Sequence, residues 1–301
     1  SRKSMKKVSI ITSLYKAEKY LKGFLENIVK QTIFDDCELF LLDANSPENE
    51  HDIIKPFLSY DNIRYERLED DPGIYACWNY MIENSDSKYI TNANVDDKLF
   101  HNSIQKHVDI LDRFSIFDVS YCLNAVSNSS SDTPESTSWA VKANSEETHA
   151  RLVNSKNQKV FPTAAFSKRN MLYTNLPHNH PVWRRSIHND CGMFDTENYI
   201  SGSDYDFWLR ASIGFDKKFI LIPEILGIYY DNPEGMSTKK ANLDRNMEEF
   251  KVISKKYHLM YHEGDITKLK ERSLEERVSN WNRFHEGSDD DYWHVGRKPS
   301  V

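Results

Sequence analysis

Residues 89–98 read "YITNANVDDK", an apolar stretch that ends on two adjacent carboxylates. Its first part has the aromatic and β-branched residues of a buried strand, and its second part is polar. Asn and Asp are common in turns, so a solvated turn explains the polar part on its own. The alternative is a cation site at the carboxyl end of a strand, and the surrounding sequence has to decide between the two.

Strands and helices alternate through the first hundred residues. The apolar runs predict strands at 7–15, 37–46, 62–68 and 88–93, and helical periodicity predicts helices at 16–32 and 73–85. This alternation predicts a doubly wound α/β fold, with a mostly parallel sheet and helices on both faces. Ligands bind outside the carboxyl ends of such strands. Polar clusters follow three of these strands, which favours a site over a turn.

The remaining chain continues the α/β pattern. We expect a helix at 102–114, a strand at 117–126, a long polar loop or flap at 127–149, a helix beginning at 203, a Pro-interrupted strand at 218–230 and a closing helix at 242–260. The charged segment after residue 262 is interpreted as a peripheral helix and a polar tail.

Composition narrows the class of protein. The chain has 301 residues and a net charge of −7, which argues against a nucleic-acid partner. No apolar run approaches the roughly 20 residues of a membrane span, and no signal-peptide core is visible, so we expect a cytoplasmic protein, with peripheral membrane association as the alternative. The phosphate-loop, dinucleotide and nucleophile-elbow motifs are missing. The four cysteines lack metal spacing and are expected to be reduced: Cys37, Cys77, Cys122 and Cys191.

Several weak motifs occur in a fixed order. They are "VSIITSLY" (8–15), "LLDANS" (41–46), "DDPGIYACWN" (70–79), "NVDD" (94–97), "HPVWRRSIHNDCGMFD" (180–195), "SGSDYDFWLR" (201–210) and "GIYYDNPEGMS" (227–237). The ordered set resembles the family 2 glycosyltransferases, and the resemblance covers roughly residues 6–240. It implies a GT-A fold and inverting transfer from a nucleotide-activated sugar, usually with Mg²⁺ or Mn²⁺.

The resemblance also implies a division of the chain. Residues 6–240 would form the GT-A catalytic domain, with a nucleotide-binding half at 6–100 and an acceptor-binding half at 101–240. Residues 241–301 would form a C-terminal helical extension and the polar tail. The expected donor is a UDP-sugar, and the expected acceptor is a hydroxyl of a surface polysaccharide or another glycan.

By this resemblance, "NVDD" occupies the place of the family's Asp-x-Asp metal motif. Asp96 is expected to be the primary metal ligand, with Asp97 supporting it. Hard cations prefer oxygen ligands, and one or two carboxylates with phosphate oxygens suffice. The cation would neutralise the leaving diphosphate. Asn94 stands where the family often has Asp, so it adds no charge, but it can hydrogen-bond a ribose hydroxyl.

The resemblance places the nucleotide on the first two strand ends. Asp43 is expected to accept a hydrogen bond from the uracil imide, with a turn-forming Asp as the alternative. Thr12 and Tyr15 are expected to cradle and stack on the base. Asp71 is expected to lie where the chain passes close to the donor, and Gly73 would permit that approach.

Inverting transfer needs a base for the acceptor's proton. The family's base matches Asp204 in "GSDYDFWLR", with a simple helix cap as the alternative. A helix N-terminus is expected to lower the pKa of Asp204 and make it a modest base. Asp206 is a weaker candidate.

Further contacts are expected from three residues. Trp183 and Arg184 would face the donor or the acceptor, with a plain surface position of the arginine as the alternative. Tyr229 or Tyr230 would stack on a sugar from a loop at 229–237. His180 and His188 are interpreted as structural histidines.

Two other functions remain open. A nucleotidyltransferase that makes the activated sugar should carry a glycine-rich, basic loop after the first strand, and "TSLYKAEKY" (12–20) has no glycine. A non-catalytic nucleotide- or glycan-binding protein should lack Asp96 or Asp204, and both are present.

Overall fold

The computed structural model describes residues 5–136, 139–144, 149–154, 160–161 and 163–262. The predicted polar tail therefore lies outside the described residues.

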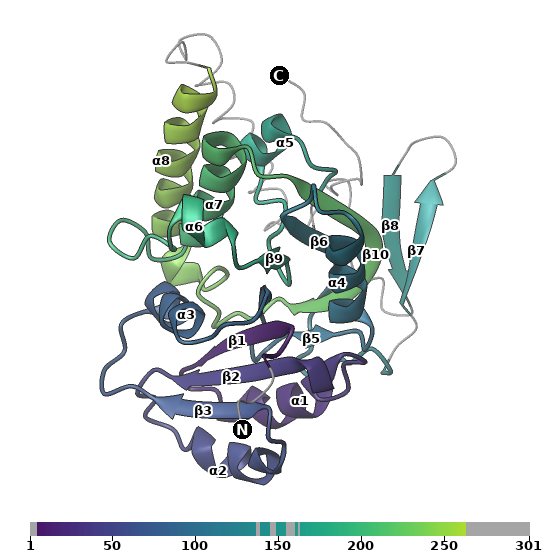
Figure 1. Cartoon of the computed structure of the whole chain (residues 1–301), viewed down its shortest axis with the longest axis vertical. Coiled ribbons are helices and arrows are strands. Elements are labelled where there is room, and N and C mark those ends of the chain that lie inside the picture. Colours follow the sequence, from purple (N-terminus) through teal and green to yellow (C-terminus); the bar gives the residue numbers. More distant parts are fainter. Residues whose placement is uncertain (1–4, 137–138, 145–148, 155–159, 162, 263–301) are drawn as a thin grey trace.

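An eight-stranded sheet forms the centre of the molecule, with strand order β3-β2-β1-β4-β9-β6-β10-β5 (Figure 1). The neighbours β3-β2, β2-β1, β1-β4 and β6-β10 are parallel, whereas β9 and β5 run antiparallel to their partners. The mostly parallel sheet predicted from the sequence is therefore confirmed. The strands are β1 (Val8–Leu14), β2 (Cys37–Asp43), β3 (Ile63–Arg67), β4 (Tyr89–Asn92), β5 (Lys98–Leu99), β6 (Val119–Ser127), β9 (Val182–Arg184) and β10 (Phe219–Tyr230).

Helices cover both faces of the sheet. Helices α1 (Glu18–Ile28) and α4 (Ser103–Arg113) pack on one face, with α2 (Glu50–Ile54) beside α1. The other face carries α3 (Ile74–Glu83), α5 (Lys168–Tyr173), α6 (Ile187–Cys191), α7 (Ser203–Leu209) and α8 (Leu243–Tyr261). Helix α8 is the closing helix expected at 242–260, and it lies beside α7 (Figure 1).

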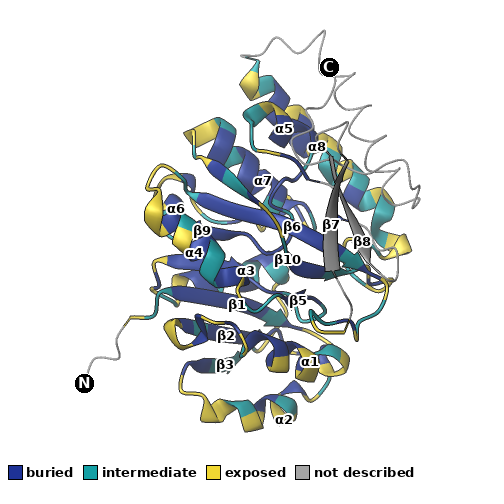
Figure 2. Cartoon of the chain, turned by 90° about the vertical axis from the view of Figure 1, so that its right-hand side faces the viewer, coloured by how far each residue is buried: buried dark blue, intermediate teal, exposed yellow. Residues whose placement is uncertain are grey.

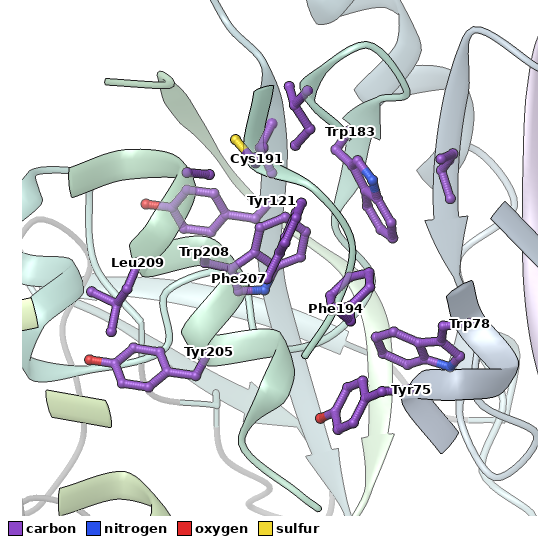
Figure 3. Packing of buried hydrophobic residues seen from close by; sticks show 14 of the residues in the cluster. Tyr75, Trp78, Tyr121, Trp183, Cys191, Phe194, Tyr205, Phe207, Trp208 and Leu209 are labelled. Atoms are coloured by element: carbon purple, nitrogen blue, oxygen red, sulfur yellow. The ribbon is translucent and has the colours of Figure 1, made fainter. Parts of the chain in front are cut away.

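Alternating side chains divide the core into two layers, because successive residues of a strand point to opposite faces. In β2, Leu39 and Leu41 face α1, whereas Phe40 and Leu42 face α3. Figure 2 shows the strands as the buried centre of the molecule, with exposed residues on the outer helix faces. The second layer includes an aromatic cluster of Trp183, Phe194, Phe207 and Trp208, shown in Figure 3.

Two features differ from the sequence-based expectation. The polar loop expected at 127–149 contains strand β7 (Trp139–Asn144), which pairs antiparallel with β8 (His149–Asn154), a strand that begins where the loop was expected to end. The segment around Trp183, expected to be a binding element, is strand β9. The Pro interruption expected in the late strand is real: the register of β10 shifts around Pro223, which has no N–H to donate. Within the described residues, no helix is long and apolar enough to cross a membrane.

Candidate active site

The polar clusters predicted from the sequence meet at one edge of the sheet. Strands β1, β2 and β4 are parallel and end at Leu14, Asp43 and Asn92. Strand β9 is antiparallel to both β4 and β6, so β6 runs in the direction of β4, and β10 follows β6. The carboxyl ends of β1, β2, β4, β6 and β10 therefore lie on the same side of the sheet. The residues that precede β9 lie on that side as well, because β9 runs the opposite way.

Asp96 and Asp97 lie in a tight turn between β4 and β5, closed by a hydrogen bond from the Asp97 N–H to the Asn94 carbonyl (3.1 Å). Asp96 Oδ2 accepts from Asn232 Nδ2 (3.0 Å). Asp97 Oδ1 accepts from the Tyr230 N–H (2.9 Å), and its Oδ2 accepts from Asn94 Nδ2 (3.3 Å). Asn94 and the Tyr230 N–H thus orient Asp97, and Asn232 orients Asp96; we call these two carboxylates the acidic pair.

The acidic pair is costly to ionise without a cation. Burial raises the pKa of Asp96, and burial together with the Asp96 charge raises the pKa of Asp97 well above its usual 3.8. Asp97 is 3% exposed, whereas Asp96 is partly accessible. Among the described residues, no three His, Cys, Asp or Glu side chains converge on a metal position. The pair therefore suits a hard cation that takes its other ligands from a phosphate-bearing substrate.

His180 lies beside this pair, a position that the sequence did not reveal. Its Nε2 is 3.7 Å from Asp97 Oδ2, and its Nδ1 shares a 2.8 Å hydrogen bond with Asn124 Oδ1. Burial lowers the pKa of His180 to about 3, so the ring is neutral. Gly227 makes this packing possible, since a Cβ there would lie 2.4 Å from His180 Nδ1. His180 is structural, as expected: its Nδ1–H donates to Asn124 Oδ1, and its Nε2 lies beside Asp97 without a hydrogen bond.

The ends of β1 and β2 carry the residues expected to bind the nucleotide. Asp43 is fully buried: its Oδ1 accepts from the Ser46 N–H (2.8 Å), and its Oδ2 from Tyr65 (2.7 Å) and Arg67 (3.0 Å). These donors fix the carboxylate at the edge of the sheet. Tyr15 follows β1 and is 50% exposed, so its ring is available to a ligand.

The structure corrects the expectation for Thr12. This side chain is 1% exposed, and its hydroxyl donates to the Ala93 carbonyl (2.8 Å). It therefore ties β1 to the segment after β4 and has no surface for a base.

Asp71 lies in an exposed turn, where its Oδ1 accepts from the Gly73 N–H (2.9 Å). Gly73 has a φ of 94°, a conformation that favours glycine, and helix α3 begins directly after it. The turn thereby sets the start of α3, which carries Tyr75.

Asp204 is held by donors from two other elements. Its Oδ1 accepts from the Tyr75 hydroxyl (3.0 Å), and its Oδ2 accepts from Asn175 Nδ2 (3.0 Å). Burial raises the pKa of Asp204, although both hydrogen bonds oppose the shift. The sequence predicted a lowered pKa from the helix N-terminus, and that direction is wrong because desolvation outweighs the helix. A raised pKa makes Asp204 a stronger base.

The Tyr75 hydroxyl can serve both protonation states of Asp204. It lies 2.9 Å from the Ser201 carbonyl as well as 3.0 Å from Asp204 Oδ1. With Asp204 ionised, Tyr75 donates its proton to the carboxylate. With Asp204 protonated, Tyr75 can donate to Ser201 and accept from the carboxylic acid.

Asp206 has a different environment from Asp204, although both lie on α7. It is fully buried and accepts from Arg210 (2.6 Å) and Tyr257 (2.8 Å), with Lys256 at 3.7 Å. These partners join α7 to α8, so Asp206 is a structural carboxylate and drops out as a candidate base.

Trp183 and Arg184 do not reach this edge. Trp183 is fully buried in the aromatic cluster, and its Nε1 donates to His188 (Figure 3). Arg184 pairs with Tyr89 at the beginning of β4, which is the opposite edge of the sheet. Its guanidinium donates to the carbonyls of Leu111 (2.5 Å) and Phe117 (2.8 Å). The expected donor or acceptor contacts of both residues are therefore corrected.

Tyr229 does lie beside the acidic pair. It is partly exposed, and its ring packs at 5.3 Å from Phe161 and 5.4 Å from His178. Burial, and then the charge of Asp97, raise the pKa of its hydroxyl well above the usual 10.0. The residues that follow it in the chain include Asn232, which contacts Asp96.

Comparison with known proteins bears on the family and the fold of the chain. The sequence profile of Glycosyl transferase family 2 matches residues 9–181. Glycosyltransferase GlyG of Streptococcus pneumoniae serotype 4 is 31% identical over 99 residues, which are 33% of this chain and 33% of GlyG. The match thus spans about a third of the length of that curated relative.

Two solved structures share the fold. S. aureus TarS 1–349 in complex with UDP-GlcNAc has a TM-score of 0.60 at 16% identity, covering 92% of this chain and 81% of that 1–349 fragment. Mannosyltransferase PcManGT from Pyrobaculum calidifontis, in complex with GDP-Man and Mn²⁺, has a TM-score of 0.61 at 9% identity, covering 95% of this chain and 77% of PcManGT. The expected GT-A fold is confirmed.

Proposed function

The chain belongs to glycosyl transferase family 2, and on that premise we propose that it is an inverting transferase for a nucleoside-diphosphate sugar. The donor is a UDP-sugar, and the acceptor is a hydroxyl of a glycan or another molecule. The observation that carries this proposal is the acidic pair, buried at the carboxyl edge of the sheet and oriented by Asn94, Asn232 and the Tyr230 N–H. Such a pair suits a cation that brings a diphosphate with it.

The donor binds to the half at residues 6–100. Asp96 and Asp97 would hold Mn²⁺ or Mg²⁺, which would neutralise the diphosphate as it leaves. The greater accessibility of Asp96 supports its role as the direct ligand, with Asp97 behind it. Tyr15 stacks on the base, and Asp43 accepts from the uracil imide once the half-exposed Arg67 side chain moves off its Oδ2. TarS, which has been solved with UDP-GlcNAc, supports uridine, whereas PcManGT was solved with GDP-Man.

The acceptor binds to the half at residues 101–240. Its hydroxyl attacks the anomeric carbon as the bond to the diphosphate breaks, and Asp204 takes the proton of that hydroxyl. Burial raises the pKa of Asp204, which supports its role as the base. Tyr75 stabilises the protonated product by turning its own proton to the Ser201 carbonyl. Tyr229 offers a ring on which a sugar can stack.

A hydrolysis screen tests the donor and the metal together. The protein is incubated with UDP-, GDP- and other nucleotide sugars in Mn²⁺, Mg²⁺ or EDTA, and release of the nucleoside diphosphate is measured. We expect release from a UDP-sugar that EDTA abolishes and that Asp96→Asn lowers by at least about a hundredfold. Asp61→Asn, an exposed carboxylate on the turn before β3, is the matched control.

Three outcomes would contradict parts of the proposal. Release that is unaffected by EDTA would refute the metal role, and release from a GDP-sugar alone would refute the uridine assignment. Binding of a nucleotide without any turnover, in the hydrolysis screen and after glycan acceptors have been added to it, would instead favour a non-catalytic binding protein.

A further inference from the structure

The segment that precedes α7 is held by a single carboxylate on the C-terminal helix. Glu249 of α8 accepts hydrogen bonds from three consecutive backbone N–H groups, those of Ile200 (2.6 Å), Ser201 (2.9 Å) and Gly202 (2.8 Å). The Ser201 hydroxyl also lies 2.7 Å from its Oε2. A carboxylate that accepts several backbone N–H bonds is a strong and directional anchor.

The close approach of α8 depends on a glycine. A Cβ at Gly202 would lie 2.7 Å from Ile253 Cδ1 and 3.4 Å from Glu249 Oε2. Helix α8 therefore packs directly against the backbone where α7 begins.

Helix α8 also holds the loop at residues 231–237, beside the acidic pair. Asn246, one turn before Glu249, donates from Nδ2 to the carbonyls of Met236 (3.1 Å) and Ser237 (3.4 Å). Its Oδ1 lies 2.7 Å from the Ser201 hydroxyl. The same loop contains Asn232, which donates to Asp96. One face of α8 thus contacts both the segment before Asp204 and the loop that contacts Asp96.

We propose that Glu249 is a positioning residue for the transfer reaction, which holds residues 200–202 and thereby sets the place of Asp204 relative to the acidic pair. The inference rests on the proposed function, because it assigns the proton transfer to Asp204. The path is short: the Ser201 carbonyl contacts the Tyr75 hydroxyl, and that hydroxyl contacts Asp204. Glu249 itself acts through the backbone and touches no reacting atom.

The test compares Glu249→Ala and Glu249→Gln with Glu248→Ala on the same helix. Glu248 is exposed and pairs only with Lys251 (3.3 Å) among the contacts of its side chain that the structure describes, so its removal changes the same charge without touching residues 200–202. Backbone amide hydrogen exchange is measured for peptides covering residues 198–205. UDP binding with Mn²⁺ and turnover of the UDP-sugar found in the screen are measured on the same samples.

We expect Glu249→Ala to speed exchange at the three amides by at least about tenfold and to lower the transfer kcat by about ten- to a hundredfold. The Kd for UDP should stay within about twofold of wild type, because the donor half is untouched. Glu249→Gln keeps one acceptor oxygen and should fall between Glu249→Ala and wild type in both measurements.

Unchanged amide exchange in Glu249→Ala would overturn the anchoring, and faster exchange with unchanged kcat would overturn the positioning role. If the wild-type protein turns over no donor, the proposed function fails, while the exchange measurement still reports on the anchor. A Glu248→Ala variant that behaves like Glu249→Ala would attribute the effect to charge or helix stability and would also refute the inference.

Discussion

Exchanging each acid of α7 for its amide separates a catalytic carboxylate from a structural one. Asp204 and Asp206 lie two residues apart on the same helix, so Asp204→Asn and Asp206→Asn are matched in chemistry and in backbone context. We expect Asp204→Asn to lower transfer strongly without loss of stability and Asp206→Asn to lower stability. The free energy of unfolding is measured by urea denaturation, and transfer is measured with the donor from the screen.

The structure explains why Asn is tolerated at position 204. Its Oδ1 can accept from Asn175 Nδ2, and its Nδ2 can donate to the Tyr75 hydroxyl, which turns its proton to the Ser201 carbonyl. All three hydrogen bonds survive, so the free energy of unfolding should stay within about 1 kcal/mol of wild type or rise. Transfer should fall by about 10²- to 10⁴-fold, the usual contribution of a general base.

The pH dependence has a defined sign. Burial raises the pKa of Asp204 in the folded protein, so the unfolded chain loses this proton at lower pH than the folded chain. Ionisation of Asp204 therefore lowers the free energy of unfolding progressively as pH rises from its usual 3.8 to its raised value. Asp204→Asn should remove that part of the pH dependence.

At Asp206 the exchange breaks a buried ion pair. Arg210 loses its counter-charge, and the amide cannot accept from both Arg210 (2.6 Å) and Tyr257 (2.8 Å) as the carboxylate does. Removing one partner of such a pair should cost about 3 kcal/mol, at the low end of the usual range because Arg210 is partly exposed. If Asp204→Asn is the less stable variant, or retains transfer, the assignment of the two carboxylates is wrong.

Three further predictions concern stability and accessibility. Gly227→Ala places a Cβ 2.3 Å from Asn124 Oδ1 and should lower the free energy of unfolding in urea by about 2–4 kcal/mol, whereas Gly214→Ala, with its nearest neighbour at 3.9 Å, should not lower it. Ser167→Ala removes the acceptor for the Asn170 N–H (2.9 Å) at the start of α5 and should cost about 1 kcal/mol in the same assay; an unchanged value would contradict the cap. Burial raises the pKa of all four thiols from 9.0 to about 11 or 12, so a thiol reagent at pH 8 should modify them only on unfolding; rapid labelling of the native protein would contradict this.

The sequence predicted the helices and strands that are long enough to show a periodic pattern of apolar residues. Strands β1 to β4 and helices α1, α3, α4 and α8 were all expected within a few residues of their observed bounds. Strand β9 was not, because its three residues show no alternation, and its pairing with β4 and β6 is set by distant segments. Strands β7 and β8 were missed because Ser/Thr/Glu-rich residues precede and separate these two short apolar runs.

The site shows the same division. Order along the sheet edge indicated Asp43, Asp96 and Asp97, because strand direction alone brings them to one side. It did not indicate that Thr12 would be buried, that Arg184 would lie at the far edge, or that His180 would neighbour Asp97. The burial of Thr12 depends on the Ala93 carbonyl beside it, and the places of Arg184 and His180 depend on strand β9, which separates β4 from β6. The predicted direction of the Asp204 pKa shift was wrong for a related reason, because the desolvation that raises this pKa exists only in the assembled core.

Strand β9 also has a consequence for the order in which the protein can be made. Strands β3, β2, β1 and β4, on one side of β9 in the sheet, come from the first hundred residues, but the outer edge of β4 stays open until Val182–Arg184 has been synthesised. At about 5–20 residues per second, that interval lasts roughly 5–20 s. Throughout it the nascent chain presents an unpaired strand edge, the kind of surface that chaperones bind and that promotes aggregation. Slowing translation between residues 92 and 184 should therefore lower the yield of soluble protein more than slowing it after residue 184.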